Sequence, residues 1–161
     1  MKKIFLVFCI SFIMFGCQDS TINSYNKIST EHQELNTQAF DALSKGIDLF
    51  NKQDYANSII EADKCTKLYT QVRDLSNQAK LLAQKMKNKA WLVQFKTLSI
   101  ESEEIRLDQC ELINKVSTYS MAKKNTEAQE TINQISDLNL KFNKLQATMD
   151  DIKNQHPEAF K

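Results

Sequence analysis

The stretch WLVQFKTLSIESEEIRLDQCELINKVSTY, residues 91–119, carries an apolar or aromatic residue at every seventh position and contains neither glycine nor proline. These residues are Trp91, Leu98, Ile105, Leu112 and Tyr119. In a helix, a seven-residue repeat keeps returning to the same side, so it forms a narrow seam against neighbouring helices. That pattern is typical of antiparallel coiled coils and elongated bundles. A helix of about 34 residues would be roughly 50 Å long, so we expect a slender, rod-like protein.

The scarcity of glycine and proline extends this prediction to the whole chain. The 161 residues include two glycines and one proline. A β-sheet protein of this length needs many turns, and these two residue types normally supply them. The sequence therefore predicts an all-α fold, an elongated antiparallel helical bundle or set of coiled-coil hairpins with about four helices.

Capping patterns place these helices in a single domain, residues 30–156. Thr30 with Gln33 forms a capping-box pattern at the start of the first helix. Asp54 can cap the second helix. Thr126 with Gln129 repeats the capping box for the fourth.

The ends of the helices and their apolar faces complete this scheme. A turn is expected near residues 87–90, although a single continuous helix is the alternative because no Gly or Pro enforces the turn. Pro157 should end the fourth helix. The expected core positions are Phe40, Leu43, Ile47 and Phe50 in the first helix; Tyr55, Ile59, Ala62, Tyr69, Val72, Ala79, Leu82 and Met86 in the second; and Ile135, Leu138, Phe142, Leu145, Met149 and Ile152 in the fourth.

The first 16 residues have the regions of a secretory signal peptide. Lys2 and Lys3 give a positive start, and of the 12 residues from Ile4 to Phe15 only Ser11 is polar. As a helix this apolar run would reach roughly 18 Å, whereas a bilayer core is about 30 Å thick. We therefore expect a signal peptide over residues 1–16 and not a membrane-spanning helix.

The residues that end this run, Met14, Gly16 and Cys17, resemble the signal of a bacterial lipoprotein. The resemblance implies cleavage between Gly16 and Cys17 and attachment of acyl chains such as palmitate to Cys17, which anchors the protein stably. Because Gln18 and not Asp follows Cys17, it further implies the outer membrane, with the protein facing the periplasm. An ordinary secretory cut after Ser11 is the alternative. Residues 17–29 would form a flexible tether.

A second, local resemblance covers residues 42–65, ALSKGIDLFNKQDYANSIIEADKC. This stretch is similar to a single tetratricopeptide-type helical hairpin, with Gly46 where two helices cross closely and with Tyr55 after the turn. Small residues at Ala62 and Cys65 match the second helix of such a hairpin. No neighbouring repeat is present, and such repeats are stable only when stacked. We expect a hairpin with similar packing.

Cys65 and Cys110 remain after lipidation of Cys17. The space outside the cytoplasmic membrane is oxidising, so two remaining cysteines form a natural pair. If the chain folds back near residues 87–88, position 65 falls beside positions 110–112. The sequence predicts a Cys65–Cys110 disulfide, with two buried free thiols as the alternative.

Catalytic chemistry has little support in the sequence. His32 and His156 lie near opposite ends of the helical region, and beyond the signal peptide Gly46 is the only glycine, so no phosphate-binding loop is expected. The cysteines and histidines offer no close ligand pair for zinc. We expect no enzyme, cofactor or metal site and interpret the following acidic run as a solvated helix face: Glu101, Glu103, Glu104, Asp108 and Glu111.

The net charge limits the possible partners. At +1 it argues against nucleic acid, because no concentrated basic face exists to neutralise phosphates. The leading hypothesis is a lipid-anchored scaffold or assembly factor that binds another envelope protein; a periplasmic inhibitor or immunity-type binder is the alternative. Leu92, Ile100 and Leu107, which lie off the seams, are candidate partner or self-association positions unless they are core.

Overall fold

The computed structural model describes residues 20–159, and this part of the chain is almost entirely helical. It contains four long α-helices and a short 3-10 helix: α1 (Ser20–Asn51), α2 (Tyr55–Lys85), α3 (Ala90–Met121), α4 (Asn125–Gln155) and η1 (Pro157–Ala159). No strand occurs in residues 20–159. Each long helix has 31 or 32 residues and is therefore about 47 Å long. The predicted all-α helical bundle is confirmed.

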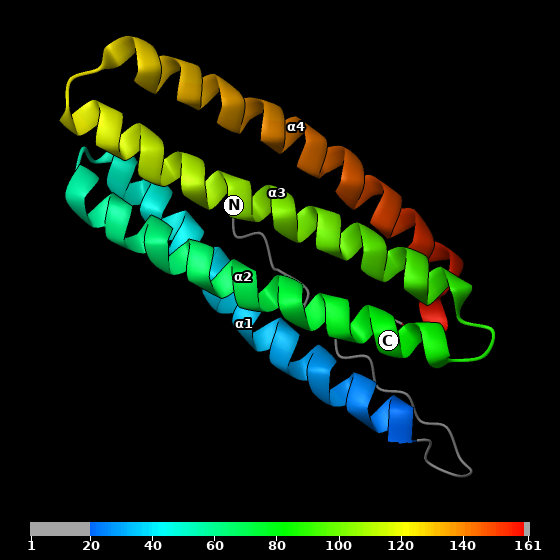
Figure 1. Ribbon diagram of the computed structural model, residues 1–161. Helices are drawn as coiled ribbons and strands as arrows, with labels where there is room; N and C mark the ends of the chain where they lie inside the picture. Colours follow the sequence, from blue (N-terminus) through cyan, green and yellow to red (C-terminus); the bar gives the residue numbers. More distant parts are fainter. Residues whose placement is uncertain (1–19, 160–161) are drawn as a thin grey trace.

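The helices form an antiparallel array in sequence order (Figure 1). α2 packs against α1 and α3, and α4 packs against α3. α1 also contacts α3, but much less extensively than it contacts α2. Within residues 20–159, the backbones of α1 and α4 do not come close to each other. The array is therefore open on the side between α1 and α4, and α3 is its central helix.

Short turns without glycine connect the helices. Each turn contains one non-glycine residue in the left-handed region: Gln53 (φ 61°), Asn88 (φ 57°) and Lys123 (φ 56°). This conformation costs a non-glycine residue roughly 1–2 kcal/mol, and asparagine tolerates it best. The turn at Asn88 separates α2 from α3, which confirms the predicted turn over the continuous helix.

α1 begins ten residues earlier than the sequence predicted. It starts at Ser20 and not at Thr30, so most of the expected tether is helix. The reason is packing: Tyr25 is only 1% exposed and clusters with Ala79, Ala83 and Leu92. Thr30 lies inside the helix and its hydroxyl donates to the Asn26 carbonyl, so it does not act as a cap. Residues 1–19, with the predicted signal peptide and the start of the tether, lie outside the described residues.

Two of the remaining boundary predictions can be compared directly. The Asp54 carboxylate accepts a hydrogen bond from the Asn57 backbone at the start of α2, which confirms it as the cap. The capping box at the start of α4 was wrong, because Lys124 occupies the cap position and makes no side-chain cap bond. Gln129 instead donates to Asn133 within the helix.

Small side chains allow α1, α2 and α3 to approach closely. Gly46 is buried, and a Cβ built on it would lie 3.5 Å from Ile113 Cγ2 and 3.7 Å from backbone atoms of α2. A methyl group therefore fits there, but a larger side chain would have to displace α2 or α3. Ile47, one position on, was predicted to be core but is 37% exposed. The main cluster of buried residues is Ala39, Ala42, Leu43, Ala62, Cys65, Tyr69, Val72, Cys110 and Ile113.

The seven-residue repeat of α3 does not mark its most buried face. Trp91, Leu98, Ile105, Leu112 and Tyr119 are all half-buried. The face towards α1 and α2 is buried more deeply and includes Leu92 at 2% exposure, so Leu92 is core and not a partner position. Leu107 is half-buried and packs against the main cluster. α3 needs two interior faces because it has neighbours on both sides.

Candidate functional site

The first notable group is a buried carboxylate in the middle of α3. Glu103 is 5% exposed, and its Oε1 accepts hydrogen bonds from Ser76 Oγ of α2 (2.6 Å) and from His32 Nε2 of α1 (2.7 Å). One oxygen therefore ties three helices together. Because Ser76 and His32 both bond to Glu103 and not to each other, the trio lacks the nucleophile-to-base hydrogen bond of a hydrolytic triad. The arrangement is an interhelical clamp.

A buried lysine accompanies this clamp. Lys96 lies on α3, 5% exposed, with its ammonium 5.6 Å from the centre of the Tyr25 ring. Burial lowers the pKa of Lys96, and the negative charge of Glu103 opposes that shift. Burial also raises the pKa of Tyr25 to about 12. The negative charge of Glu103 therefore offsets part of the cost of burying Lys96.

Arg106 lies about one turn beyond Glu103 on α3, and its surroundings differ from those of Glu103 and Lys96. Its guanidinium carbon lies 3.7 Å from the centre of the Phe142 ring on α4 and 5.8 Å from that of Phe40 on α1. Nη1 donates to Gln109 Oε1 (2.8 Å), and Gln109 in turn donates to Asn139 on α4 (2.9 Å). Burial lowers the pKa of Arg106, and the nearby Tyr69 opposes that shift. At this point, α3 contacts α4 through the Arg106 cation and the neutral side-chain amide of Gln109.

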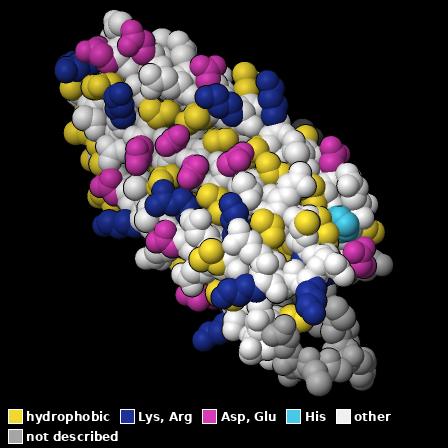
Figure 2. Space-filling model, turned by 45° about the vertical axis from the view of Figure 1, so that its right-hand side comes forward, with side chains coloured by type: hydrophobic (Ala, Val, Ile, Leu, Met, Phe, Trp, Pro, Cys, Tyr) yellow, Lys and Arg dark blue, Asp and Glu magenta, His cyan; other side chains and the backbone are white. Residues whose placement is uncertain are grey.

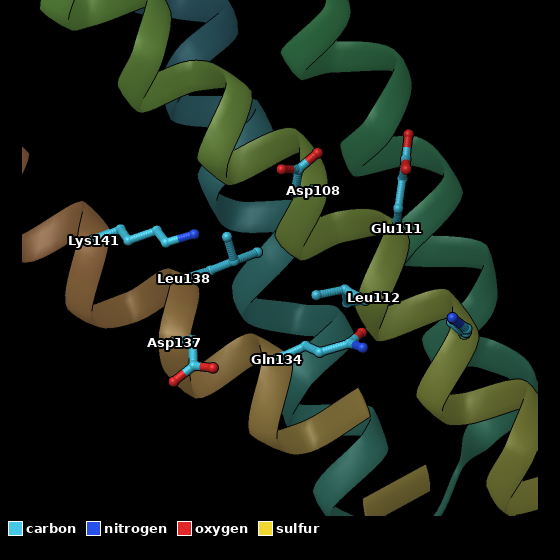
Figure 3. Close-up of a pocket in the computed structure, with 8 residues that line it drawn as sticks. Asp108, Glu111, Leu112, Gln134, Asp137, Leu138 and Lys141 are labelled. Carbon is cyan, nitrogen blue, oxygen red and sulfur yellow. The ribbon is translucent and has the colours of Figure 1, made fainter. Parts of the chain in front are cut away.

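On the outer side of the α3–α4 seam lies a groove of about 430 Å³. Leu112 of α3 and Leu138 of α4 point into it, and Gln134 and Lys141 extend from α4 towards α3 (Figure 3). Charged groups of both signs border this apolar floor; they are Asp108, Glu111, Lys115, Asp137 and Lys141. The groove can therefore accept a chain that has both apolar and charged side chains.

Cys65 of α2 and Cys110 of α3 are brought together as predicted. Their Cα atoms are 5.8 Å apart and their sulfur atoms lie at disulfide distance, 45 residues apart in sequence. Both residues are fully buried in the main cluster. The oxidation state of the pair remains a prediction, and the Cα–Cα separation is one that a disulfide can span.

The interpretation of the acidic run as a solvated face was wrong at one position. Glu101, Glu104, Asp108 and Glu111 are exposed, but Glu103 is buried. The exposed four follow each other at spacings of three or four and share a helix face, whereas Glu103 lies about 120° around the helix from the middle of that face. The positions of these acidic residues around the helix could therefore have marked Glu103 as the exception to the solvated face.

The two histidines have separate roles. His32 belongs to the Glu103 clamp, which sequence reasoning missed. His156 stacks on Trp91, with ring centres 4.4 Å apart, and closes the end of α4 against α3. In residues 20–159 no three His, Cys, Asp or Glu side chains are grouped so that they could hold a metal ion.

Gly16 and Cys17, the predicted cleavage and lipidation positions, lie outside the described residues. None of the helices in residues 20–159 combines the length and the apolar character that crossing a membrane requires. Comparison of the chain with protein-family models, with curated proteins and with solved structures finds no match. The tetratricopeptide-type resemblance therefore stays a prediction, in a hairpin whose helices are each about as long as a whole repeat of that type.

Proposed function

We propose that this chain is a lipid-anchored protein of the bacterial cell envelope that acts as a helical interaction module and binds another envelope protein. The anchor rests on the resemblance of the residues around Gly16 and Cys17 to a lipoprotein signal. The interaction role rests on one observation, the groove between α3 and α4. The proposal gives the rod a role as a scaffold or assembly factor.

The groove has the chemistry of a protein-binding surface. Leu112 and Leu138 provide an apolar centre, and charged residues form its border. Protein interfaces commonly have an apolar core and a polar rim, and an amphipathic helix binds such a groove through its apolar face. Opposite charges on the border favour one partner and one orientation over others. Figure 2 shows a row of Asp and Glu bordered by Lys and Arg on one face, so charge is mixed and not concentrated.

Photo-crosslinking in cells tests the interaction. A photoreactive amino acid at Lys141, which lines the groove, should trap a discrete partner, because its side chain reaches into the binding surface. The control position is Asn143, equally exposed but about 200° around α4. An adduct with one identified envelope protein at position 141 and not at 143 supports the proposal. No adduct at 141, or equal labelling at both positions, contradicts it.

The same experiment separates the two binding hypotheses. If mass spectrometry of the adduct identifies an endogenous envelope component, the scaffold role is supported. If only a foreign enzyme or phage component is recovered, the inhibitor or immunity-type role replaces it.

The lipid anchor has its own test. Metabolic labelling with a palmitate analogue should tag the wild-type protein and not the Cys17→Ser variant, and the variant should leave the membrane fraction. A variant that still partitions with membranes would contradict the anchor without affecting the groove.

A further inference from the structure

Arg106 is a cation without a matching anion in the described part of the chain. The carboxylates of residues 20–159 that form ion pairs do so with His32, Lys45, Lys153 and His156. None pairs with Arg106, whose one side-chain hydrogen bond goes to Gln109. Burying a charge against apolar groups without a counter-charge is unfavourable. Within residues 20–159, Arg106 therefore has no ion-pair partner.

Arg106 is half-buried, and part of its guanidinium makes no hydrogen bond within residues 20–159. The buried polar side-chain atoms without a partner belong to Tyr25, Asn26, Ser29, Glu61 and Glu103, and none belongs to Arg106. Nε and Nη2 make no hydrogen bond in the described residues, and neither atom is completely buried. They form one of the two edges on which arginine binds a carboxylate with two parallel hydrogen bonds.

The surroundings hold this edge in place. Phe142 covers one side of the guanidinium at 3.7 Å and Phe40 lies 5.8 Å away, so aromatic groups from α4 and α1 border it. Gln109 fixes Nη1, which leaves the planar group little freedom to rotate. Arginine is one of the residue types enriched at binding hot spots, and an arginine already held by a stacked ring and a hydrogen bond loses less conformational freedom when a partner binds.

We infer that Arg106 anchors an Asp or Glu side chain of a partner protein at the open side of the array, between α1 and α4. The neighbours of Arg106 do not line the α3–α4 groove; they are Gln109, Phe40, Phe142 and Tyr69. The inference rests on the proposed function only because it takes the ligand to be a protein. It defines a second contact surface, separate from the α3–α4 groove, that binds a carboxylate.

The chain contains two arginines, Arg73 and Arg106, which makes a direct test possible. In an ¹⁵N-arginine NMR spectrum each Nε–H gives one signal, and an Arg73→Lys variant assigns them. The probe is a short helical peptide carrying two Glu residues one turn apart, at 50 mM salt, with the same peptide carrying Gln as control. We expect the Arg106 signal to shift and saturate with the Glu peptide only, while Arg73, half-exposed on α2, shifts much less.

Other outcomes of this titration overturn the inference. Equal shifts at Arg73 and Arg106 would indicate non-specific attraction, and no shift at Arg106 would mean that it serves only the internal packing of α4. Sodium acetate acting as strongly as the peptide would indicate a small-carboxylate site, and stronger shifts with phosphate would indicate a different anion.

Variants separate binding from folding. Arg106→Gln should weaken binding of the Glu peptide about 30-fold, the loss expected for a hot-spot residue. The affinity of Arg106→Lys for the Glu peptide should lie between those of the wild type and Arg106→Gln, because lysine keeps the charge but lacks the two-donor edge. Asn139→Ala, which removes a tie between α3 and α4 but keeps the guanidinium, should leave Kd within about twofold. If Asn139→Ala weakens binding as much as Arg106→Gln does, the effect comes from a loosened α4 and the inference fails.

Discussion

The three helices α1, α2 and α3 are joined to one another far more extensively than α4 is joined to them. The main cluster of buried residues belongs to α1, α2 and α3, as do the Cys65–Cys110 pair and the Glu103 clamp. α4 packs on α3, and in the described residues it buries fully only Ala128, Thr131, Met149 and Ile152. Size alone does not explain this difference, because all four helices have almost the same length.

The kind of contact also differs between the two regions. At the middle of the α3–α4 seam, Gln109 bonds to Asn139 and Gln146 bonds to Ser102, and Arg106 stacks on Phe142. Such polar and partly exposed contacts contribute only about 1 kcal/mol each. Regions with few buried apolar contacts open first in native proteins. We therefore assign stability to α1–α3 and adaptable surface to α4, whose seam with α3 borders both proposed contact surfaces.

The largest expected effect comes from Glu103. Glu103→Ala should lower the free energy of unfolding by about 3–5 kcal/mol, because it removes the shared acceptor for Ser76 and His32 and the negative charge that offsets the burial of Lys96. Urea unfolding followed by circular dichroism measures this loss. Glu101→Ala, two residues away and exposed, should change stability by no more than about 0.5 kcal/mol. Similar losses in both variants would refute the clamp.

The cysteine pair should have the next largest effect. Replacing Cys65 and Cys110 together with alanine should cost about 2–4 kcal/mol, because a disulfide that closes a 45-residue separation restricts the unfolded chain. In denaturant and before reduction, neither residue should be alkylated, as detected by mass spectrometry; denaturant is needed because both residues are fully buried in the folded protein. A thiol that is alkylated at either position without reductant would show that the pair is not oxidised.

Two buried tyrosines should make the α1–α3 unit sensitive to alkaline pH. Burial raises the pKa of Tyr25 and of Tyr69 from 10.0 to about 12 in the folded protein. The folded state therefore holds these protons more tightly, and each tyrosine contributes up to roughly 3 kcal/mol that is present below pH 10 and lost as pH rises towards 12. Lys96 has the opposite effect. Because burial lowers its pKa, the folded state releases this proton more easily than the unfolded state, so stability rises as pH approaches 10.5.

Phenylalanine variants check this pH dependence. Tyr25→Phe should reduce the loss of stability between pH 10 and 12, and near pH 7 it should change stability by less than about 1 kcal/mol because the Tyr25 hydroxyl makes at most a poorly aligned contact with Ser29. Tyr55→Phe, at a half-exposed position, serves as the control and should keep the wild-type profile. A Tyr25→Phe profile identical to wild type would contradict the prediction.

The smallest expected effect concerns helix caps. Asp54→Ala should cost about 1 kcal/mol, because the carboxylate caps α2 through the Asn57 backbone. Thr126→Ala at the start of α4 should change stability by only a few tenths of that, since α4 has no side-chain cap. Thermal melts of the two variants make the comparison. An equal loss in both would show that α4 is as well anchored at its start as α2.

Much of the fold follows from the sequence because it depends on local rules. Scarce glycine and proline predict helices, apolar spacing predicts their number, and Asp54 predicts one boundary. The start of α1 was missed because Tyr25 lies within a polar stretch, and its burial depends on Ala79, Ala83 and Leu92 from other helices. The turns could be placed only approximately, because Gln53, Asn88 and Lys123 adopt a conformation that their residue types seldom show.

The candidate site was harder to predict for the same reason. Glu103 could have been recognised because it lies off the helix face that the other four acidic residues share, but its partners His32 and Ser76 come from helices that only the folded chain brings together. Arg106 gave no local signal, since its surroundings depend on Phe40 and Phe142, more than 30 residues away on either side. Long-range pairing, and not propensity, decides these contacts.

Native-state hydrogen exchange, resolved by helix, tests the difference between the two regions most directly. We predict that backbone amides in the middle of α4 exchange at least about tenfold faster than those in the middle of α2, because α4 can open from α3 while α1–α3 stays folded. The protected amides of α2 should then exchange only with global unfolding. If α4 and α2 show equal protection and the same response to denaturant, the four helices form one cooperative unit, and the division into a stable α1–α3 unit and an adaptable α4 is wrong.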